Sequence, residues 1–177
     1  MFGLYEAFNF KKWINENRHL LKPPVGNKCV WPQRDFIVMV VGGPNERTDF
    51  HVNAGEEFYH QIEGDMVLKI RDLEGNIQDI QIREGDIYLL PGNTPHSPQR
   101  PADSVGLVIE RRRRENEIDG LQWFCENCGH KLYEEFFKLE NIETQFPAVF
   151  DRYYNGEHTI CKKCLTKNGR KWTHVKS

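Results

Sequence analysis

The chain has 177 residues, with 24 basic and 26 acidic side chains and a formal net charge of −2. This length suits one domain of ordinary size with a small appendage. The near-neutral charge argues against a nucleic-acid partner, and the lack of any stretch of about 18 apolar residues argues against a membrane span.

The N-terminal segment predicts a short helix. Residues 1–6 lack the basic start and apolar core of a signal peptide, so we expect a cytoplasmic protein, in which disulfides are rare. Asn9 is a suitable N-cap, and Pro23-Pro24 should end the helix. The residues that recur at helical spacing between them are Phe10, Trp13, Ile14, Asn17, Leu20 and Leu21.

Between Asp35 and Arg111 the sequence changes to short apolar or alternating runs separated by turn signals. Residues 74–76, Glu-Gly-Asn, predict a hairpin turn. The runs that we expect to form strands are Phe36–Val41, Glu57–Gln61, Met66–Asp72, Ile77–Ile82, Ile87–Leu90 and Val105–Glu110. Many short strands at this spacing predict a mainly β domain built as an antiparallel sandwich or barrel.

Two glycine-to-histidine patterns lie in this region. The first runs from Gly43 to His51 and continues through Glu57 to Gly64, and the second runs from Gly85 to His96. Together they offer two imidazoles and one carboxylate. This is the ligand set of a non-haem Fe(II) oxygenase, in which one face of the metal stays open for substrate and O2.

Strand periodicity supports this interpretation. Residues two apart share a strand face, which groups Arg47 and Asp49 with His51, and Arg100 with His96. The alternative is that each histidine is a hydrogen-bonded structural residue and each arginine extends to water. Charged groups are almost never buried without a partner or a metal, so the whole set favours a site. The residues expected inside the barrel are Arg47, His51, Glu57, His96, Arg100 and Glu110.

At these positions the sequence resembles the cupin superfamily, which implies a cupin (double-stranded β-helix, jelly-roll) barrel. Asp49 stands where the first histidine of the usual His-x-His pair is expected, so a three-His, one-Glu site becomes two His and one Glu. We expect Asp49 to orient a metal ligand or Arg47. The second motif departs from the cupin pattern at Asn93 and Arg100.

Four longer stretches resemble one family, the 3-hydroxyanthranilate 3,4-dioxygenases, in their short microbial and fungal form with a rubredoxin-like tail. These stretches are residues 21–27, 41–49, 89–100 and 108–111. The resemblance covers nearly the whole chain. It implies that both atoms of O2 are inserted into 3-hydroxyanthranilate to give 2-amino-3-carboxymuconate semialdehyde, the precursor of quinolinate in NAD biosynthesis by the kynurenine pathway. It also implies Fe(II) held by His51, Glu57 and His96.

The resemblance further implies which residues handle the substrate. Arg47 and Arg100 would bind its carboxylate, because a guanidinium offers a planar fork of donors. Glu110 would accept a proton from the substrate hydroxyl or amine; the alternative is an ion pair with residues 111–114. Asn27 matches a position that lines the family's pocket.

The run Arg111–Arg114 is interpreted as a solvated strand end, balanced by Glu115, Glu117 and Asp119. It could also form part of a subunit interface. Exposed sheet edges and the family resemblance together imply a homodimer. Four arginines beside three acids do not indicate nucleic-acid binding.

The C-terminal segment predicts a second metal site. Two Cys-x-x-Cys pairs form the pattern of a tetrahedral all-thiolate site, and they are Cys125, Cys128, Cys161 and Cys164. Gly129 should help the first turn. Such a site suits Fe or Zn and has no open position, so we expect a structural role; disulfides are the alternative. Cys29 is left over and is expected to be a small buried apolar residue.

A helix-like segment, Leu139–Tyr154, separates the cysteine pairs, and Pro147 inside it should kink or split it. We therefore divide the chain into a catalytic barrel with its N-terminal helix, residues 1–114, and a C-terminal metal-binding extension, residues 115–177. Two other functions are compatible with the sequence. One is another metal-dependent cupin enzyme acting on an acidic aromatic compound, and the other is a non-catalytic cupin binding module with a zinc-ribbon tail.

Overall fold

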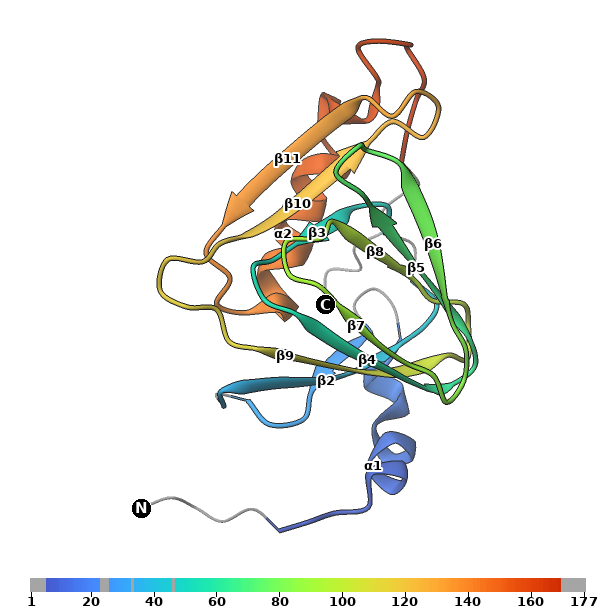
Figure 1. Cartoon of the computed structure of the whole chain (residues 1–177), viewed down its shortest axis with the longest axis vertical. Coiled ribbons are helices and arrows are strands. Elements are labelled where there is room, and N and C mark those ends of the chain that lie inside the picture. Colours follow the sequence, from blue (N-terminus) through green and yellow to red (C-terminus); the bar gives the residue numbers. More distant parts are fainter. Residues whose placement is uncertain (1–5, 23–25, 33, 46, 170–177) are drawn as a thin grey trace.

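The computed structural model describes residues 6–22, 26–32, 34–45 and 47–169. Two antiparallel sheets face one another and enclose the core (Figure 1). The first contains, in spatial order, β1 (Asn27–Cys29), β2 (Phe36–Gly42), β9 (Val105–Arg111), β4 (Glu57–Glu63) and β7 (Ile87–Leu90). The second contains β11 (Lys131–Phe137), β10 (Asp119–Phe124), β3 (Phe50–Val52), β8 (His96–Gln99), β5 (Met66–Arg71) and β6 (Ile77–Ile82).

The prediction of a mainly β domain, built as an antiparallel barrel with an N-terminal helix, is confirmed. All six expected strands form, each ending within two residues of its predicted end, and residues 74–76 lie in the turn between β5 and β6. Side chains alternate as a strand requires: in β4, Glu57, Tyr59 and Gln61 are buried. The core between the sheets consists of Met39, Val41, Tyr59, Met66, Leu68, Ile82, Leu90 and Val108.

The N-terminal helix α1 (Phe10–Asn17) is shorter than expected and is followed by a 3-10 turn, Arg18–Leu20. Asn9 is its N-cap as predicted, since its side chain accepts from the backbone N–H of Lys12 at 2.8 Å. Ile14 is almost fully buried against Val40 and Val105, so the helix covers part of the outer face of the first sheet. The two prolines expected to end the helix lie outside the described residues.

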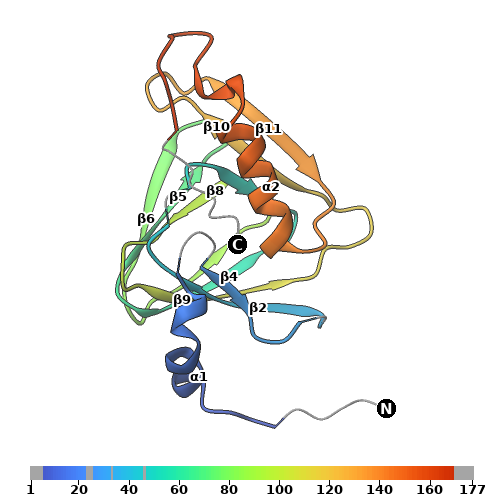
Figure 2. The same ribbon diagram turned by 180° about the vertical axis from the view of Figure 1, so that it is seen from behind.

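The C-terminal part of the chain extends the barrel's own sheet. β10 pairs with β3, with Leu121 opposite His51, and β11 continues the sheet beyond it. Helix α2 (Ile142–Tyr154) lies against β10 and β11, as Figure 2 shows from behind. Its contact is an aromatic cluster that contains Leu121, Trp123, Phe146, Val149, Phe150 and Tyr153.

Helix α2 differs from its prediction in two ways. It begins at Ile142 rather than Leu139, with Asn141 as N-cap, and it runs without a break through Pro147. A proline removes one helical hydrogen bond, here near the start of the helix. The buried side chains on either side of it, Phe146 and Val149, keep the segment packed against the sheet. Among the described residues, no helix is long and apolar enough to cross a membrane.

Candidate functional site

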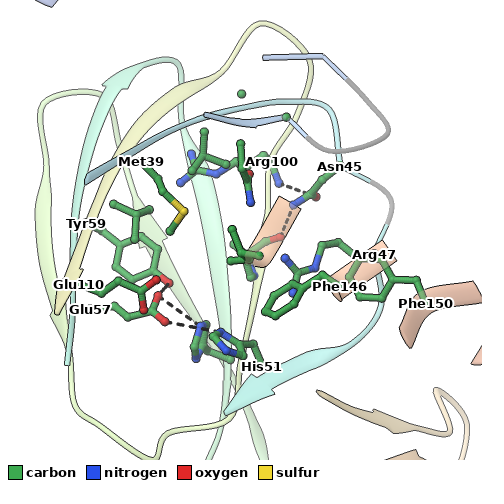
Figure 3. Close-up of a pocket in the computed structure, with 18 residues that line it drawn as sticks. Met39, Asn45, Arg47, His51, Glu57, Tyr59, Arg100, Glu110, Phe146 and Phe150 are labelled. Atoms are coloured by element: carbon green, nitrogen blue, oxygen red, sulfur yellow. Dashed lines mark hydrogen bonds and ion pairs between the residues drawn. The ribbon is translucent and has the colours of Figure 1, made fainter. Parts of the chain in front are cut away.

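One pocket lies between the two sheets and is lined by residues from both of them and from α2 (Figure 3). The residues that the sequence predicted for the barrel site all line it: Asn27, Arg47, His51, Glu57, His96, Arg100 and Glu110. Five of them lie on the strands β1, β3, β4, β8 and β9, while Arg47 precedes β3 and Arg100 directly follows β8. The fold therefore brings together groups that lie more than 80 residues apart in the chain.

Three of these side chains converge as metal ligands would. The Nδ1 atom of His51 lies 3.5 Å from one carboxylate oxygen of Glu57, and the Nε2 atom of His96 lies 3.4 Å from the other. His51 and His96 are directly opposite each other on β3 and β8. One ligand atom from each of the three residues lies within 4.8 Å of the others, and all three residues are buried.

The hydrogen bonds on the far side of each imidazole fix which nitrogen carries the lone pair. The Nε2 atom of His51 lies 2.6 Å from the carboxylate of Asp119, and the Nδ1 atom of His96 lies 2.9 Å from the carbonyl oxygen of Thr94. Both partners only accept hydrogen bonds, so each imidazole donates there. In a neutral imidazole the nitrogen that faces Glu57 is then the lone-pair donor that a metal needs.

The pKa values agree with a cation site. Burial lowers the pKa of His51 and keeps it neutral. Burial opposes the charge of His96 as well, but the carboxylate of Glu57 outweighs it and raises the pKa of His96. Burial would raise the pKa of Glu57, yet the neighbouring His96 holds it well below the ordinary value. A metal cation fits this cluster, because it would take the place of the proton that His96 and Glu57 share.

Tyr59 is a site residue that the sequence analysis did not single out. Its hydroxyl donates to a carboxylate oxygen of Glu57 at 2.7 Å, and its ring is 3% exposed. The signal was present, because Tyr59 follows Glu57 by two residues on one face of β4. The bond holds the carboxylate in one orientation relative to the histidines.

We expected Arg47 to share a strand face with His51, and this is wrong, because β3 begins only at Phe50. Its guanidinium is nevertheless held in the pocket by a two-point contact with Asp49, at 2.9 and 2.5 Å. Asp49 is fully buried and is absent from the metal-ligating cluster, so its contact is with Arg47. Phe146 and Phe150 of α2 lie against the guanidinium, 5.4 and 5.2 Å from its central carbon to their ring centroids.

Arg100 is a buried cation without a carboxylate partner among the described residues. It is 3% exposed and donates to the side-chain oxygen of Gln61 at 2.9 Å, while its Nε atom has no hydrogen-bond partner. Burial lowers its pKa to about 10. An isolated buried charge is costly, so this arginine lines the pocket in a state that an anionic ligand would stabilise.

Glu110 lies across the pocket from Arg47 (Figure 3) and next to Glu57, its partner in the pairing of β4 with β9. Asn53 donates to its carboxylate at 3.3 Å and Arg113 at 2.6 Å. Burial, with the charge of Glu57, raises the pKa of Glu110 to about 8, against the opposing effect of Arg113. Glu110 therefore both lines the pocket and forms the ion pair that the sequence left open as an alternative.

The interpretation of Arg111–Arg114 as a solvated strand end is wrong for Arg113, whose side chain is only 8% exposed. It is also wrong for Asp119, which is fully buried and binds both Arg113 and His51. It holds for Arg111, which pairs with Glu117 near the surface. The sequence did contain a signal for the burial of Asp119. It lies two and four residues before Leu121 and Trp123, so the three residues share the buried face of β10.

The four cysteines of the tail also converge. The Sγ atoms of Cys125 and Cys164 lie 3.6 Å apart, as do those of Cys128 and Cys161. These distances exclude disulfides, and all four cysteines are free. A metal with sulfur ligands at 2.3 Å in a tetrahedron would separate the sulfurs by about 3.8 Å. The cluster therefore fits such a metal.

The two cysteine loops have the same backbone turn. In the first loop, the amide of Gly129 donates to the carbonyl of Cys125, and in the second the amide of Leu165 donates to that of Cys161. Gly129 has a φ of 68°, which confirms its predicted role in the turn, and Leu165 has a φ of 60°. Cys29, which we expected to be buried, is half-buried.

Helix α2 supplies pocket residues that the sequence analysis assigned only to a structural tail. They are Ile142, Phe146 and Phe150, which all line the pocket, and Figure 3 shows Phe146 and Phe150 beside Arg47. The hydroxyl of Tyr154, at the end of the same helix, lies 3.0 Å from that of Thr48, next to Arg47. Helical spacing alone showed that these residues share a face, but it could not show which surface that face covers.

Comparison with known proteins gives a consistent result. The family model described as 3-hydroxyanthranilic acid dioxygenase matches residues 1–154. A 3-hydroxyanthranilate 3,4-dioxygenase of Xanthomonas euvesicatoria pv. vesicatoria is 59% identical over 162 residues, which cover 91% of each chain. One from a Jannaschia species is 52% identical over 160 residues, covering 89% of this chain and 88% of the other. Among solved structures, a cupin-2 domain protein of Shewanella frigidimarina has a TM-score of 0.48 and 21% identity, covering 60% of this chain and 95% of that one.

Proposed function

The chain belongs to the 3-hydroxyanthranilate 3,4-dioxygenase family, and from this premise we propose which residues carry out the reaction. The protein is a metal-dependent ring-cleaving dioxygenase. It converts 3-hydroxyanthranilate and O2 to 2-amino-3-carboxymuconate semialdehyde, from which quinolinate forms in NAD biosynthesis. The observation that carries the assignment of residues is the cluster of His51, Glu57 and His96 in the same pocket as Arg100, a buried arginine with no carboxylate partner among the described residues.

We assign Fe(II) to His51, Glu57 and His96. The support is the donor set, two imidazole lone pairs and a carboxylate, in three residues that all line the pocket. Fe(II) in such a site supplies adjacent open positions for a chelating substrate and O2. The chain's own residues hold the ligands in place: Asp119 and Thr94 orient the imidazoles, and Tyr59 orients the carboxylate.

The substrate carboxylate is bound by Arg100 and Arg47. Arg100 carries the stronger argument, because its charge is buried, its Nε is unpaired and no carboxylate of the described chain pairs with it. Arg47 is already paired with Asp49, which fixes its orientation and leaves the remaining donors of its planar fork for the ligand. Asn27, on β1, also lines the pocket.

Glu110 accepts the proton of the substrate hydroxyl. Its pKa, raised to about 8, makes the ionised carboxylate a stronger base than an ordinary glutamate. Arg113 and Asn53 hold the Oε2 atom of Glu110, so the other carboxylate oxygen is the one that can receive the proton. Transfer to that oxygen leaves the hydroxyl oxygen of the substrate as an anion able to bind a metal.

Helix α2 excludes water from the reacting groups. Ile142, Phe146 and Phe150 present apolar surface to the pocket, and the two phenylalanine rings lie against Arg47. Exclusion of water strengthens the contact between a guanidinium and a carboxylate and protects reactive species. On this view the residues beyond 114 complete the catalytic barrel of residues 1–114 and also form the extension that binds the second metal.

The four-cysteine site holds a structural metal, either Fe or Zn. Its support is the four converging thiols, two of them buried, and the hydrogen bonds that reach the sulfurs, such as that from the side-chain amide of Asn168 to Cys125 at 3.5 Å. A four-thiolate site has no open coordination position and so performs no chemistry on a substrate. Its metal-binding free energy would stabilise the fold of the tail.

A second copy of the chain is the proposed partner, in a cytoplasmic homodimer. The outer face of the first sheet leaves apolar side chains uncovered beyond α1, with exposed fractions of 64% for Phe36, 66% for Ile87 and 54% for Leu89. In register with Leu89 lie Phe58 and Ile109, both half-buried, so the apolar band crosses three strands. The band offers the same surface on both copies, as a two-fold dimer requires. Sedimentation of the native protein and of Leu89→Lys tests this, and two equal monomeric masses would contradict it.

The test of the function is a single-turnover reaction. Purified protein is stripped of metal, loaded with Fe(II) under anaerobic conditions, mixed with 3-hydroxyanthranilate and exposed to air. We expect the absorbance of the ring-opened product and consumption of one O2 per substrate. Reloading with Zn(II) in place of Fe(II) is the matched control and should give no product. Equal product with both metals, or none with Fe(II), would contradict the assignment.

A further inference from the structure

A buried carboxylate stands behind one of the proposed metal ligands. Asp119, the first residue of β10, is 0% exposed, and one of its oxygens lies 2.6 Å from the Nε2 atom of His51. The opposite ring nitrogen of His51 faces Glu57. A carboxylate in this position holds the imidazole in one tautomer and one orientation, and it raises the basicity of the nitrogen that binds metal.

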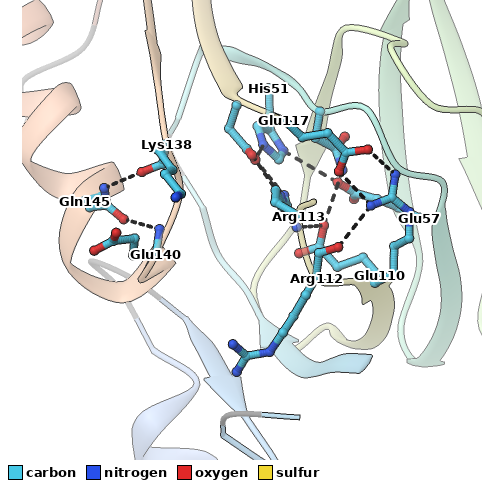
Figure 4. A network of polar contacts seen from close by, with 12 residues as sticks. His51, Glu57, Glu110, Arg112, Arg113, Glu117, Lys138, Glu140 and Gln145 are labelled. Carbon is cyan, nitrogen blue, oxygen red and sulfur yellow. Dashed lines mark hydrogen bonds and ion pairs between the residues drawn. The ribbon is translucent and has the colours of Figure 1, made fainter. Parts of the chain in front are cut away.

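A single arginine connects this carboxylate to Glu110. Arg113 donates from Nε and from one terminal nitrogen to the two oxygens of Asp119, at 2.8 and 2.5 Å. Its other terminal nitrogen donates to Glu110 at 2.6 Å. Figure 4 shows the Arg113 side chain between His51 and Glu110. One planar guanidinium therefore links two carboxylates that serve different parts of the site.

A general stabilising role explains this arrangement poorly. A buried ion pair often contributes little net stability, because the charges must first be removed from water. Here one cation and two carboxylates are almost fully buried, with side-chain exposures of 8% for Arg113, 2% for Glu110 and 0% for Asp119. The neighbouring pair Arg111–Glu117 uses the same chemistry near the surface, where it reaches no pocket residue.

We propose that Asp119 and Arg113 are positioning residues of the catalytic centre. Asp119 sets the ring of His51 so that its Nδ1 faces the metal, and Arg113 holds Asp119 and Glu110 at a constant separation. A metal bound by His51 and the proton-accepting carboxylate of Glu110 would thereby keep a fixed relative position. These roles rest on the proposed function, since they presuppose a metal on His51 and a proton accepted by Glu110.

The two residues should have distinguishable effects. Asp119→Asn keeps the size of the side chain but loses its charge and its two-point contact with Arg113, so metal affinity in the barrel should fall about 10–100-fold. Arg113→Lys keeps a positive charge but cannot bind both carboxylates in a planar fork. We expect it to lower kcat about tenfold or more at full metal loading, with KM nearly unchanged, because Arg47 and Arg100 still bind the substrate.

The experiment uses Co(II) as the probe metal in the full-length protein. Affinity is measured by competition with a chelator, and the spectrum separates the two sites, because thiolate ligands give intense charge-transfer bands and the barrel site only weak d–d bands. The tail site then serves as an internal measure of folded protein. Glu117→Gln is the matched control, since it breaks the Arg111 pair on the same segment and should bind Co(II) as the native protein does.

The outcomes separate the inference from the proposed function. If the native protein shows only the thiolate bands, the barrel does not bind Co(II), and the proposed metal site itself is wrong. If the native barrel binds Co(II) and Asp119→Asn binds it with equal affinity and an unchanged d–d spectrum, the role of Asp119 is wrong. Equal losses of Co(II) affinity in Asp119→Asn and Glu117→Gln would mean that both substitutions only destabilise the protein, and the role of Asp119 would again be wrong. Arg113→Lys decides separately, because an unchanged kcat would exclude the link to Glu110.

Discussion

The guanidinium of Arg47 lies 5.4 Å from the ring centroid of Phe146, which places a residue of the cysteine-containing extension against a residue of the barrel pocket. Phe146 is also part of the aromatic cluster that packs α2 onto β10. The C-terminal extension is therefore a wall of the pocket and not only a metal-binding appendage.

This contact predicts a defect in substrate binding when the ring is removed. Phe146→Leu keeps an apolar side chain but loses the cation–π contact with Arg47, worth about 0.5–2 kcal/mol. We expect KM for 3-hydroxyanthranilate to rise about 2- to 30-fold, with a smaller change in kcat. The control is Tyr133→Leu, which removes a ring from the same cluster without touching Arg47. A similar rise in KM for both variants would refute the specific contact.

Loss of a proposed ligand should empty one metal site and leave the other intact. His96→Ala removes one of three ligands, so we expect barrel iron and turnover to be lost together, while the tail retains its metal. Metal analysis per chain, before and after mild chelation, measures both sites. Full iron and activity in this variant would mean that the ligand set is wrong.

Arg100 should contact the carboxylate of the substrate and no other group of the substrate. Arg100→Ala should cost about 1.5–3 kcal/mol in kcat/KM for 3-hydroxyanthranilate, the range for a hydrogen bond to a charged group. The same substitution should change kcat/KM little for 2-aminophenol, which lacks the carboxylate. Equal proportional losses with the two substrates would indicate a damaged fold instead.

Glu110 predicts how the stability of the metal-free protein changes with pH. Its pKa lies at about 8 in the folded protein against an ordinary 4.5, so between these values the folded state binds more protons than the unfolded state. The free energy of unfolding contributed by Glu110 is therefore fully present below about pH 4.5 and declines as the pH rises through about 8. Denaturant unfolding of the native protein and of Glu110→Gln should show a shallower decline in the variant. Parallel curves would exclude this contribution.

The cysteine site should support the fold and not the chemistry. Cys125→Ser should lose the tail metal and lower Tm, because metal-binding free energy becomes folding free energy. Turnover per barrel iron should stay close to native, since α2 is held by the aromatic cluster around Trp123 and not by the cysteines themselves. A folded variant with full barrel iron and no turnover would show that the second metal takes part in catalysis.

The sequence by itself determined the barrel and most of its pocket. Strand alternation and turn residues act over a few neighbours, so the six strands and the inward direction of Glu57, His96 and Glu110 could be predicted from local pattern. The spacing within each Cys-x-x-Cys pair is equally local. Its metal-binding geometry follows from the residues themselves.

Only the tertiary structure decided the contacts between distant segments. Arg113 and Asp119 lie in a charged stretch whose composition is that of a solvated loop. Their burial depends on the pairing of β10 with β3, which brings Asp119 to His51, 68 residues earlier in the chain. In the same way, the amphipathic face of α2 is visible in the sequence, but the surface that it covers is not. Such pairings arise from the packing of whole sheets and helices, which a local pattern does not encode.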